Sequence, residues 1–313
     1  MALKILYFGT NHPKSIKPLQ ALDQDQQIVG VVEWSPKKSA PKKVLRQIYH
    51  YGKGLRGEEK TLGSFAKKRN ILHIDTYVCP VNSKLFEERV KSLQPDLICV
   101  SYFGDRIPLS IIEIPKYGGI NAHGSYLPNY QGAIPWFWQY YHMEEEGGVT
   151  IHRLTDKQDA GEILIQEKFP IELGLTEERL LQKITDLTVK LMREAVADIE
   201  KTGRVGRGKM TDYEEAPDHL IRGRCIQRNE RFIDWETWNV DRVYHFLRGT
   251  GAIELNAPYP GGIWNVLGFQ RCDPEGKPGE IEKRTEGHRL YCKNGFVLLK
   301  SRFSMKALVK GLI

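Results

Sequence analysis

The chain opens with Leu3-Lys4-Ile5-Leu6-Tyr7-Phe8-Gly9-Thr10, a short apolar run that ends at a glycine. A helix-like stretch through Leu19 and Leu22 follows, and then a second apolar run at residues 28–32. Strand, helix and strand in this order are typical of the first βαβ unit of a doubly wound α/β sheet. The turn between them, Gly9-Thr10-Asn11-His12-Pro13, lacks the Gly-x-Gly-x-x-Gly pattern that brings a backbone against a pyrophosphate. A dinucleotide-dependent oxidoreductase is therefore disfavoured.

The following segments continue this alternation of helices and short strands. The pattern predicts two more helices, at residues 64–69 and 82–93. It also predicts two more strands, at residues 71–74 and 97–100. The run at 97–100 is fully apolar, as expected of a strand buried on both faces of a parallel sheet. The loop at 101–108 comes directly after it, where open α/β sheets bind their ligands. A long amphipathic helix is predicted at 176–200, closing this part of the fold.

The last third of the chain predicts a second domain. Residues 203–223 contain glycine, charge and proline with few apolar residues, which is typical of a linker. Short alternating runs follow, and Asn294-Gly295 between two of them is a hairpin signal. Short strands with such turns indicate a small barrel, and two domains are the default for 313 residues. We predict an α/β domain at residues 1–202, a linker at 203–223 and a barrel domain at 224–313.

Composition and charge exclude some classes of protein. The net charge is +7, from 46 Lys and Arg against 39 Asp and Glu; this suits an anionic partner but is also common in proteins without one. No apolar run approaches the roughly 20 residues that span a bilayer, and the strand-like opening argues against a signal peptide. The five cysteines are scattered without Cys-x-x-Cys spacing. We therefore expect no disulfides, no metal site and a cytoplasmic location.

The clearest chemical signature lies in Gly118-Gly119-Ile120-Asn121-Ala122-His123-Gly124. Alternation along a strand points Asn121 and His123 to the same face at the end of the strand. An amide that stabilises an oxyanion and an imidazole that moves a proton together suit acyl transfer. Downstream, Asp159 precedes Ala160-Gly161 and is a natural partner that fixes the tautomer of His123. Taken alone, the Asn-x-His motif is weak evidence, and a buried structural histidine is the better explanation of His123. For Asp159, the alternative is an ordinary turn residue.

Taken together, these segments resemble the folate-dependent formyltransferases, in the methionyl-tRNA formyltransferase-like branch. That family has an Asn-x-His strand end, a Ser-Leu-Leu-Pro loop and a later Asp-x-Gly, and this chain has counterparts in the same order. The resemblance covers most of the chain and implies a Rossmann-like sheet followed by a small OB-like barrel. It also implies formyl transfer from 10-formyltetrahydrofolate, with Asn121, His123 and Asp159 as the catalytic residues.

The resemblance further implies which residues bind ligands. Two loops would lie against the folate, with residues Asp105, Arg106, Ile107, Thr155, Asp156, Lys157 and Gln158. A substrate loop would follow the catalytic strand, with residues Ser125, Tyr126, Leu127, Pro128 and Gln131. Tyr126 and Gln131 depart from the family's usual Leu and Arg, which bears on the identity of the substrate and not on the chemistry. No metal is required for this reaction.

Enzymes of this branch differ in the amine that they formylate. Three features favour a nucleotide-linked amino sugar, and with it a role in O-antigen or lipopolysaccharide synthesis. The first two are Gln131 and the sequence Arg231-Phe232-Ile233-Asp234-Trp235. The third is that residues 36–60 lack the Pro-rich pattern expected of a tRNA-binding insertion. A methionyl-tRNA formyltransferase is the alternative, because residues 36–60 are basic and could contact phosphates. The same charges also fit the solvent-facing side of an amphipathic helix, and this interpretation is favoured.

A third hypothesis belongs to a different class: a non-catalytic nucleic-acid-binding protein that uses the basic segment and the C-terminal barrel. The combination of Asn121, His123 and Asp159 disfavours it, because a binding module needs no such set of residues. The C-terminal domain has two open roles, recognition of the substrate and formation of a homodimer.

Overall fold

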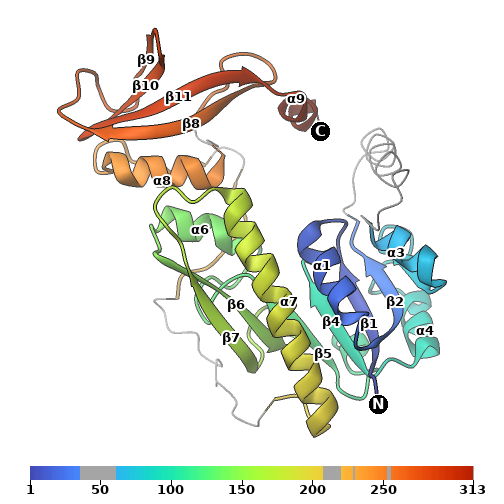
Figure 1. Cartoon of the computed structure of the whole chain (residues 1–313). Coiled ribbons are helices and arrows are strands. Elements are labelled where there is room, and N and C mark those ends of the chain that lie inside the picture. Colours follow the sequence, from blue (N-terminus) through green and yellow to red (C-terminus); the bar gives the residue numbers. More distant parts are fainter. Residues whose placement is uncertain (36–60, 207–219, 228–229, 252–254, 313) are drawn as a thin grey trace. The chain divides into compact units, whose positions relative to one another are not determined.

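The structure is a computed structural model and describes residues 1–35, 61–206, 220–227, 230–251 and 255–312 (Figure 1). The basic segment 36–60 singled out in the sequence therefore lies outside the described residues, as do residues 207–219 of the predicted linker. Within the described ranges, none of the helices has the length and apolar character that crossing a membrane requires.

The large sheet has seven strands. In spatial order they are β3 (Leu72–Asp75), β2 (Gln27–Glu33), β1 (Lys4–Gly9), β4 (Leu97–Ser101), β5 (Gly119–His123), β6 (Glu146–Arg153) and β7 (Ile163–Pro170). The first five run parallel, and β6 is antiparallel to β5. The strand order reverses direction at β1, whose two neighbours are β2 and β4, which is the hallmark of a doubly wound fold. The predicted α/β class is confirmed, with β3 as an edge strand.

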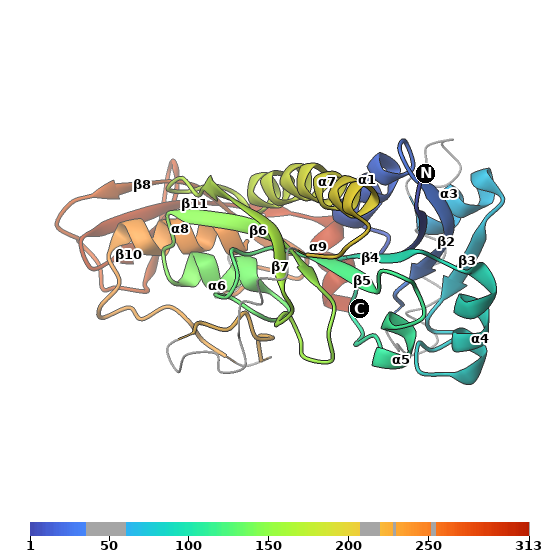
Figure 2. The same ribbon diagram turned by 90° about the horizontal axis from the view of Figure 1, so that it is seen from below.

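Helices cover both faces of this sheet. They are α1 (Pro13–Leu22), α3 (Leu62–Arg69), α4 (Lys84–Leu93), α5 (Leu109–Ile112) and α7 (Glu177–Thr202). Helices α1 and α7 lie on one face, and α4 and α5 on the other (Figure 2). Local sequence sets where they begin: the Ser83 hydroxyl, for example, accepts a hydrogen bond from the Phe86 N–H at 3.2 Å and caps α4.

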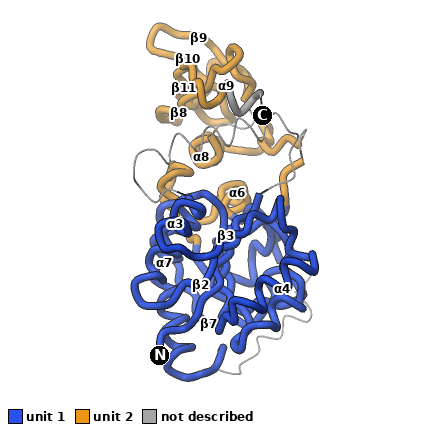
Figure 3. The backbone as a smooth tube through the Cα atoms, turned by 90° about the vertical axis from the view of Figure 1, so that its right-hand side faces the viewer, with its two compact units in different colours: residues 1–135, 148–169, 181–224 blue, residues 136–147, 170–180, 225–313 orange. Residues whose placement is uncertain are grey.

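The described residues group into two compact units, which Figure 3 shows in different colours. Unit 1 comprises residues 1–135, 148–169 and 181–224, and contains most of the seven-stranded sheet. Unit 2 comprises residues 136–147, 170–180 and 225–313. The domain limits derived from the sequence, 1–202, 203–223 and 224–313, stay a prediction.

Unit 2 is built on a four-stranded antiparallel sheet. The strands of this sheet are β8 (Gly262–Arg271), β9 (Ile281–Arg284), β10 (Gly287–Cys292) and β11 (Gly295–Phe303). The helices of unit 2 are α6 (Pro135–Tyr141), α8 (Val240–Thr250) and α9 (Met305–Leu312). The strand order is β8-β11-β10-β9, and the hairpin predicted at Asn294-Gly295 joins β10 to β11. The sheet is consistent with the predicted small barrel. Phe137 of α6 packs here too, with its ring centroid 4.7 Å from that of Phe232 and 5.4 Å from that of Phe246.

His245 on α8 is a buried titratable side chain of unit 2. It is 2% exposed, and its Nδ1 accepts a hydrogen bond from the Gly174 N–H at 3.0 Å. Its ring centroid lies 4.9 Å from that of Tyr140. Burial among these groups lowers the pKa of His245 from 6.5 to about 4. Protonated Nδ1 could no longer accept the bond from Gly174.

We therefore expect the free energy of unfolding to fall between pH 6.5 and pH 4. In this window the unfolded chain binds a proton at His245 that the folded chain does not, which costs about 2 kcal/mol at pH 5. Urea unfolding of the wild type and His245→Gln at pH 7 and pH 5 measures the effect. The variant lacks this proton and should lose less stability between the two pH values. An equal loss in both proteins would contradict the assignment.

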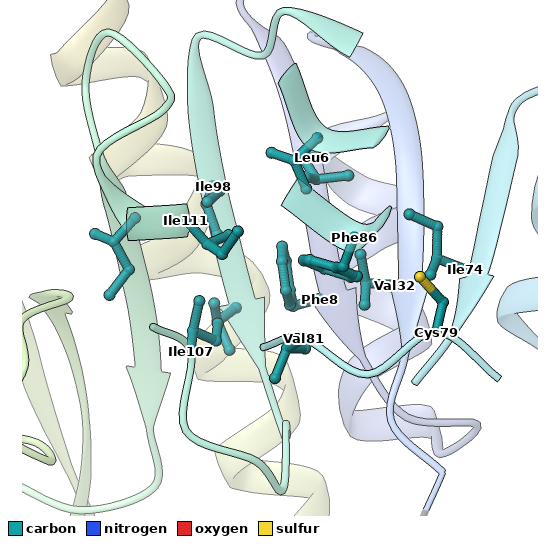
Figure 4. Close-up of a cluster of buried hydrophobic side chains, with 13 residues drawn as sticks. Leu6, Phe8, Val32, Ile74, Cys79, Val81, Phe86, Ile98, Ile107 and Ile111 are labelled. Atoms are coloured by element: carbon teal, nitrogen blue, oxygen red, sulfur yellow. The ribbon is translucent and has the colours of Figure 1, made fainter. Parts of the chain in front are cut away.

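The core of unit 1 continues into the loop that follows β4. Figure 4 shows Leu6 and Phe8 of β1, Val32 of β2 and Ile98 of β4 packed together with Phe86 of α4. The ring of Phe8 lies 6.1 Å from that of Phe86, and 5.2 Å from that of Phe103 in the loop. Close packing of this kind holds side chains in single conformations. The loop at residues 103–107 is thus anchored to the core of the sheet.

Candidate active site

Strand pairing in unit 1 brings two histidines and an asparagine together. β5 is antiparallel to β6, and the register places Asn121 opposite His152 and His123 opposite Thr150. Opposite residues of an antiparallel pair point to the same face. The rings of His123 and His152 are 6.5 Å apart between centroids. Both histidines are buried, with exposures of 7% and 2%.

Asn121 and His152 orient each other. Asn121 Nδ2 donates to His152 Nε2 at 3.0 Å, and His152 Nδ1 lies 3.0 Å from the carbonyl oxygen of Arg153. A carbonyl oxygen only accepts, so Nδ1 carries the proton and Nε2 is the acceptor. These two bonds fix the tautomer of His152 and the amide orientation of Asn121. Asn121 has a second N–H that this bond does not use.

His123 is held through its other ring nitrogen. Nε2 donates to the carbonyl oxygen of Tyr130 at 2.9 Å, so in the neutral ring Nδ1 is unprotonated. Nδ1 lies 3.7 Å from Asp159 Oδ2. Burial lowers the pKa of His123, although the charge of Asp159 and the bond to Tyr130 act in the opposite direction. At neutral pH His123 is therefore uncharged, with the lone pair of Nδ1 beside a carboxylate.

Asp159 lies between the two histidines. Its side chain is 9% exposed, and Oδ1 is 3.6 Å from His152 Nε2. Oδ2 accepts a hydrogen bond from the Gly132 N–H at 2.9 Å. Burial alone would raise the pKa of Asp159, but both histidines and the Gly132 N–H outweigh it and bring the pKa to about 2. The carboxylate is thus ionised at neutral pH.

The loop that carries Asp159 is shaped by its backbone. Asp159 itself has a φ of 51°, in the left-handed region, which Asp adopts more readily than most residues. At Gly161 the chain returns so close to β6 that a Cβ would lie 1.9 Å from the carbonyl oxygen of Arg153. Glycine is thus required there, and it holds the Asp159 loop against the strand.

A cavity of about 330 Å³ opens beside this group. Its lining includes Asn121, His152 and Asp159, together with all seven residues predicted to hold the folate: Asp105, Arg106, Ile107, Thr155, Asp156, Lys157 and Gln158. Apolar residues of the sheet and loops complete it: Val100, Phe103, Ile112 and Leu154. The lining includes His152 and does not include His123, whose Nδ1 is 3.7 Å from Oδ2 of the lining residue Asp159.

His152 is the functional candidate that the sequence analysis did not assign. It stands in the run Thr150-Ile151-His152, and its alternation with the buried Ile151 is a normal strand pattern. The signal that would have found it is the pairing of β5 with β6, because only the register places it opposite Asn121.

The predicted substrate loop is tied mostly to the protein interior. The Ser125 hydroxyl donates to the carbonyl oxygen of Asn129 at 2.8 Å, and the Leu127 N–H donates to the Thr150 hydroxyl at 3.1 Å. A cis peptide bond joins Leu127 to Pro128. Tyr126, in contrast, is 39% exposed.

Gln131, the other departure from the family pattern, points inward. Its side chain is 6% exposed, and Nε2 donates to the carbonyl oxygen of Asp159 at 3.0 Å. The residue therefore supports the backbone of the Asp159 loop, and its neutral amide is suited to that bond.

Comparison with known proteins agrees with this geometry. Residues 66–196, which include Asn121, His123 and Asp159, match the family described as formyl transferase. A methionyl-tRNA formyltransferase of Bacillus mycoides (strain KBAB4) is 29% identical over 248 residues, which cover 79% of this chain and 72% of that protein. One from Citrifermentans bemidjiense is 28% identical over 230 residues, covering 70% of this chain and 68% of that protein.

Solved structures share the fold over nearly the whole chain. An N-formyltransferase from Helicobacter canadensis, in complex with folinic acid and dTDP-3-aminofucose, has a TM-score of 0.64 at 16% identity, covering 96% of this chain and all (100%) of that one. WlaRD, a sugar 3N-formyl transferase, has a TM-score of 0.61 at 15% identity, covering 97% and 100%. Residues 66–196 thus match the formyl transferase family, and together with the methionyl-tRNA formyltransferase relatives they indicate that this chain is a formyl-transferring enzyme.

Proposed function

We propose that this enzyme transfers a formyl group from 10-formyltetrahydrofolate to the primary amine of a nucleotide-linked amino sugar. The observation that carries the reaction is the position of the Asn121 amide, which His152 orients and which lines the cavity beside the Asp159 carboxylate. A preorganised N–H donor next to an acid–imidazole pair is the arrangement that acyl transfer to an amine requires.

The cavity lining fits the folate donor. Phe103, Ile107 and Leu154 provide apolar walls, and residues 155–158 provide polar groups from the opposite loop. A flat heteroaromatic ring with polar edges is bound by such a mixture of apolar walls and a few polar groups. When bound, the donor supplies a formyl carbon attached to a nitrogen leaving group.

In the proposed reaction the residues of this chain stabilise charge and move one proton. The unprotonated acceptor amine forms a bond to the formyl carbon, and the bond from that carbon to the donor nitrogen breaks. The free N–H of Asn121 stabilises the negative charge on the formyl oxygen. His123 Nδ1 binds the proton that the amine releases, Asp159 stabilises the imidazolium, and the proton leaves with the donor nitrogen.

The choice of an amino sugar rests on two observations. Two sugar N-formyltransferases share the fold over 96% and 97% of this chain. In addition, Gln131 directs a neutral amide to the Asp159 backbone, where the family's usual Arg would add a cation beside the substrate. Methionyl-tRNA is the second candidate, since the sequence relatives are methionyl-tRNA formyltransferases and the chain carries a net charge of +7.

The deciding experiment offers the enzyme 10-formyltetrahydrofolate with a panel of nucleotide-linked amino sugars and, in parallel, with methionyl-tRNA. Release of tetrahydrofolate and formylation of the amine are both measured. We expect turnover with an amino sugar and none with the tRNA. Turnover with the tRNA alone would overturn the proposed acceptor and leave the donor in place. Failure of the donor to bind would overturn the proposal as a whole.

His152 provides a prediction that the sequence motifs do not. Replacing it with alanine removes the acceptor that orients the Asn121 amide, so we expect kcat to fall about tenfold, the equivalent of one hydrogen bond. His152→Gln keeps an acceptor oxygen and should recover most of the activity. Steady-state kinetics of both variants measures this. Equal losses in the two variants would show that His152 acts otherwise than through Asn121.

A further inference from the structure

Three consecutive residues, Tyr130, Gln131 and Gly132, hold both His123 and Asp159. The carbonyl oxygen of Tyr130 accepts from His123 Nε2 at 2.9 Å. The N–H of Gly132 donates to Asp159 Oδ2 at 2.9 Å, and the Gln131 side chain donates to the Asp159 carbonyl oxygen at 3.0 Å. A shift of this short segment therefore moves the imidazole and the carboxylate together.

Residues 130–132 are in turn held by a segment almost a hundred residues later in the chain. The N–H of Tyr130 donates to the carbonyl oxygen of Ile221 at 2.6 Å. The N–H of Gly223 donates to the carbonyl oxygen of Gln131 at 2.8 Å. The N–H of Ile134 then donates to the carbonyl oxygen of Gly223 at 2.9 Å. These bonds form a short parallel bridge between Gln131 and Arg222. We call residues 221–223 the strap.

The strap lies so close to the loop that only glycine fits at two positions. A Cβ on Gly223 would lie 2.9 Å from the carbonyl oxygen of Tyr130 and 3.0 Å from backbone atoms of Pro135. A Cβ on Gly132 would lie 2.7 Å from the carbonyl oxygen of Gly223, at a φ of 128°. Because the obstacles are backbone atoms, a side chain at either position must displace the loop.

We propose that Gly223 is a positioning residue: through the strap it sets the placement of His123 and Asp159, which it does not itself touch. This proposal rests on the proposed catalytic roles of those two residues. The hydrogen bonds of the strap are all to main-chain groups, so the register of residues 221–223 against 130–134 is what matters. The side chain of Arg222, which is exposed, takes no part in these bonds.

The test compares Gly223→Ala with Gly268→Ala, where an added Cβ has no neighbour within 4 Å. For Gly223→Ala we expect kcat to fall on the order of ten- to a hundredfold with little change in KM, as displaced catalytic groups cause. The pH–rate profile should also shift, because His123 loses part of its bond to Tyr130. Gly268→Ala should keep wild-type kinetics. Wild-type kinetics in both variants would overturn the proposal.

A second readout does not depend on activity. ¹⁵N-histidine NMR, with the His123 signal identified from His123→Gln, should show a changed Nε2 resonance in Gly223→Ala and not in Gly268→Ala. An unchanged resonance would contradict the positioning role. If the wild type transferred no formyl group but this resonance moved, the proposed function would fail and the strap would stand.

A milder pair of variants covers the case in which Gly223→Ala does not fold. Arg222→Gly and Arg222→Ala both remove the same exposed side chain, and they differ only in the backbone freedom of the strap. We expect a lower kcat for Arg222→Gly than for Arg222→Ala. Equal kcat values in the two variants would contradict the proposal that the backbone of the strap positions His123 and Asp159.

Discussion

Replacing Asn121 with alanine is expected to lower kcat for formyl transfer by about a hundred- to a thousandfold, the usual effect of losing one oxyanion donor. The amide is already oriented by His152 at 3.0 Å before any substrate binds, so the wild type needs no reorganisation at this donor. The loss should fall on kcat, because the charge on the formyl oxygen develops only during the reaction. Single-turnover kinetics with saturating donor and acceptor measures it.

Two controls accompany this variant. The thermal midpoint should stay close to that of the wild type, since Asn121 is partly exposed and lines the cavity. Asn121→Asp keeps the shape and removes the donor, so it should lose at least as much activity as Asn121→Ala. Near wild-type kcat in either variant would exclude Asn121 as the oxyanion donor.

Replacing Asp159 with asparagine is expected to lower kcat by roughly a hundred- to ten-thousandfold, the range found when an acid–base group or its orienting partner is lost. In the wild type the Gly132 N–H donates to Asp159 Oδ2 at 2.9 Å. The amide oxygen of the asparagine can still accept this hydrogen bond. What disappears is the negative charge between His123 and His152. A protonated His123 then has no counter-ion, and its pKa should fall further.

The same variant should also be less stable at neutral pH. The pKa of Asp159 is depressed from 3.8 to about 2, so the ionised carboxylate stabilises the fold above pH 4, and this contribution is lost as the pH falls towards 2. Urea unfolding at pH 7 of Asp159→Asn, against Asp198→Asn on the exposed side of α7 as a matched control, measures it. Equal stabilities would contradict the buried charge pairing.

Much of the large sheet was determined by local sequence. The apolar runs at residues 3–8, 28–32 and 97–100 became β1, β2 and β4, because a strand buried on both faces needs apolar residues at every position. The hairpin at Asn294-Gly295 formed as predicted, since that dipeptide adopts the required turn. Asn121, His123 and Asp159 could likewise be selected as candidates from short motifs.

The strand β8 shows where local patterns stop being informative. It spans Gly262–Arg271 and was not predicted. Its pairing with β11 contains a register shift between Leu298 and Leu299, and such an irregularity breaks the period-two alternation that identifies a strand.

Only the tertiary structure decided how the candidate site is held. His152 became a partner of Asn121 through the register of β5 against β6, and Gln131 turned inward to the backbone of Asp159. The strap at residues 221–223 reached the loop at 130–134 through backbone bonds that carry no side-chain signature. Motifs record which side chains the chemistry needs, because chemistry depends on residue type. Contacts between main-chain groups from distant segments depend on register and folding topology, and any sequence that folds this way can make them.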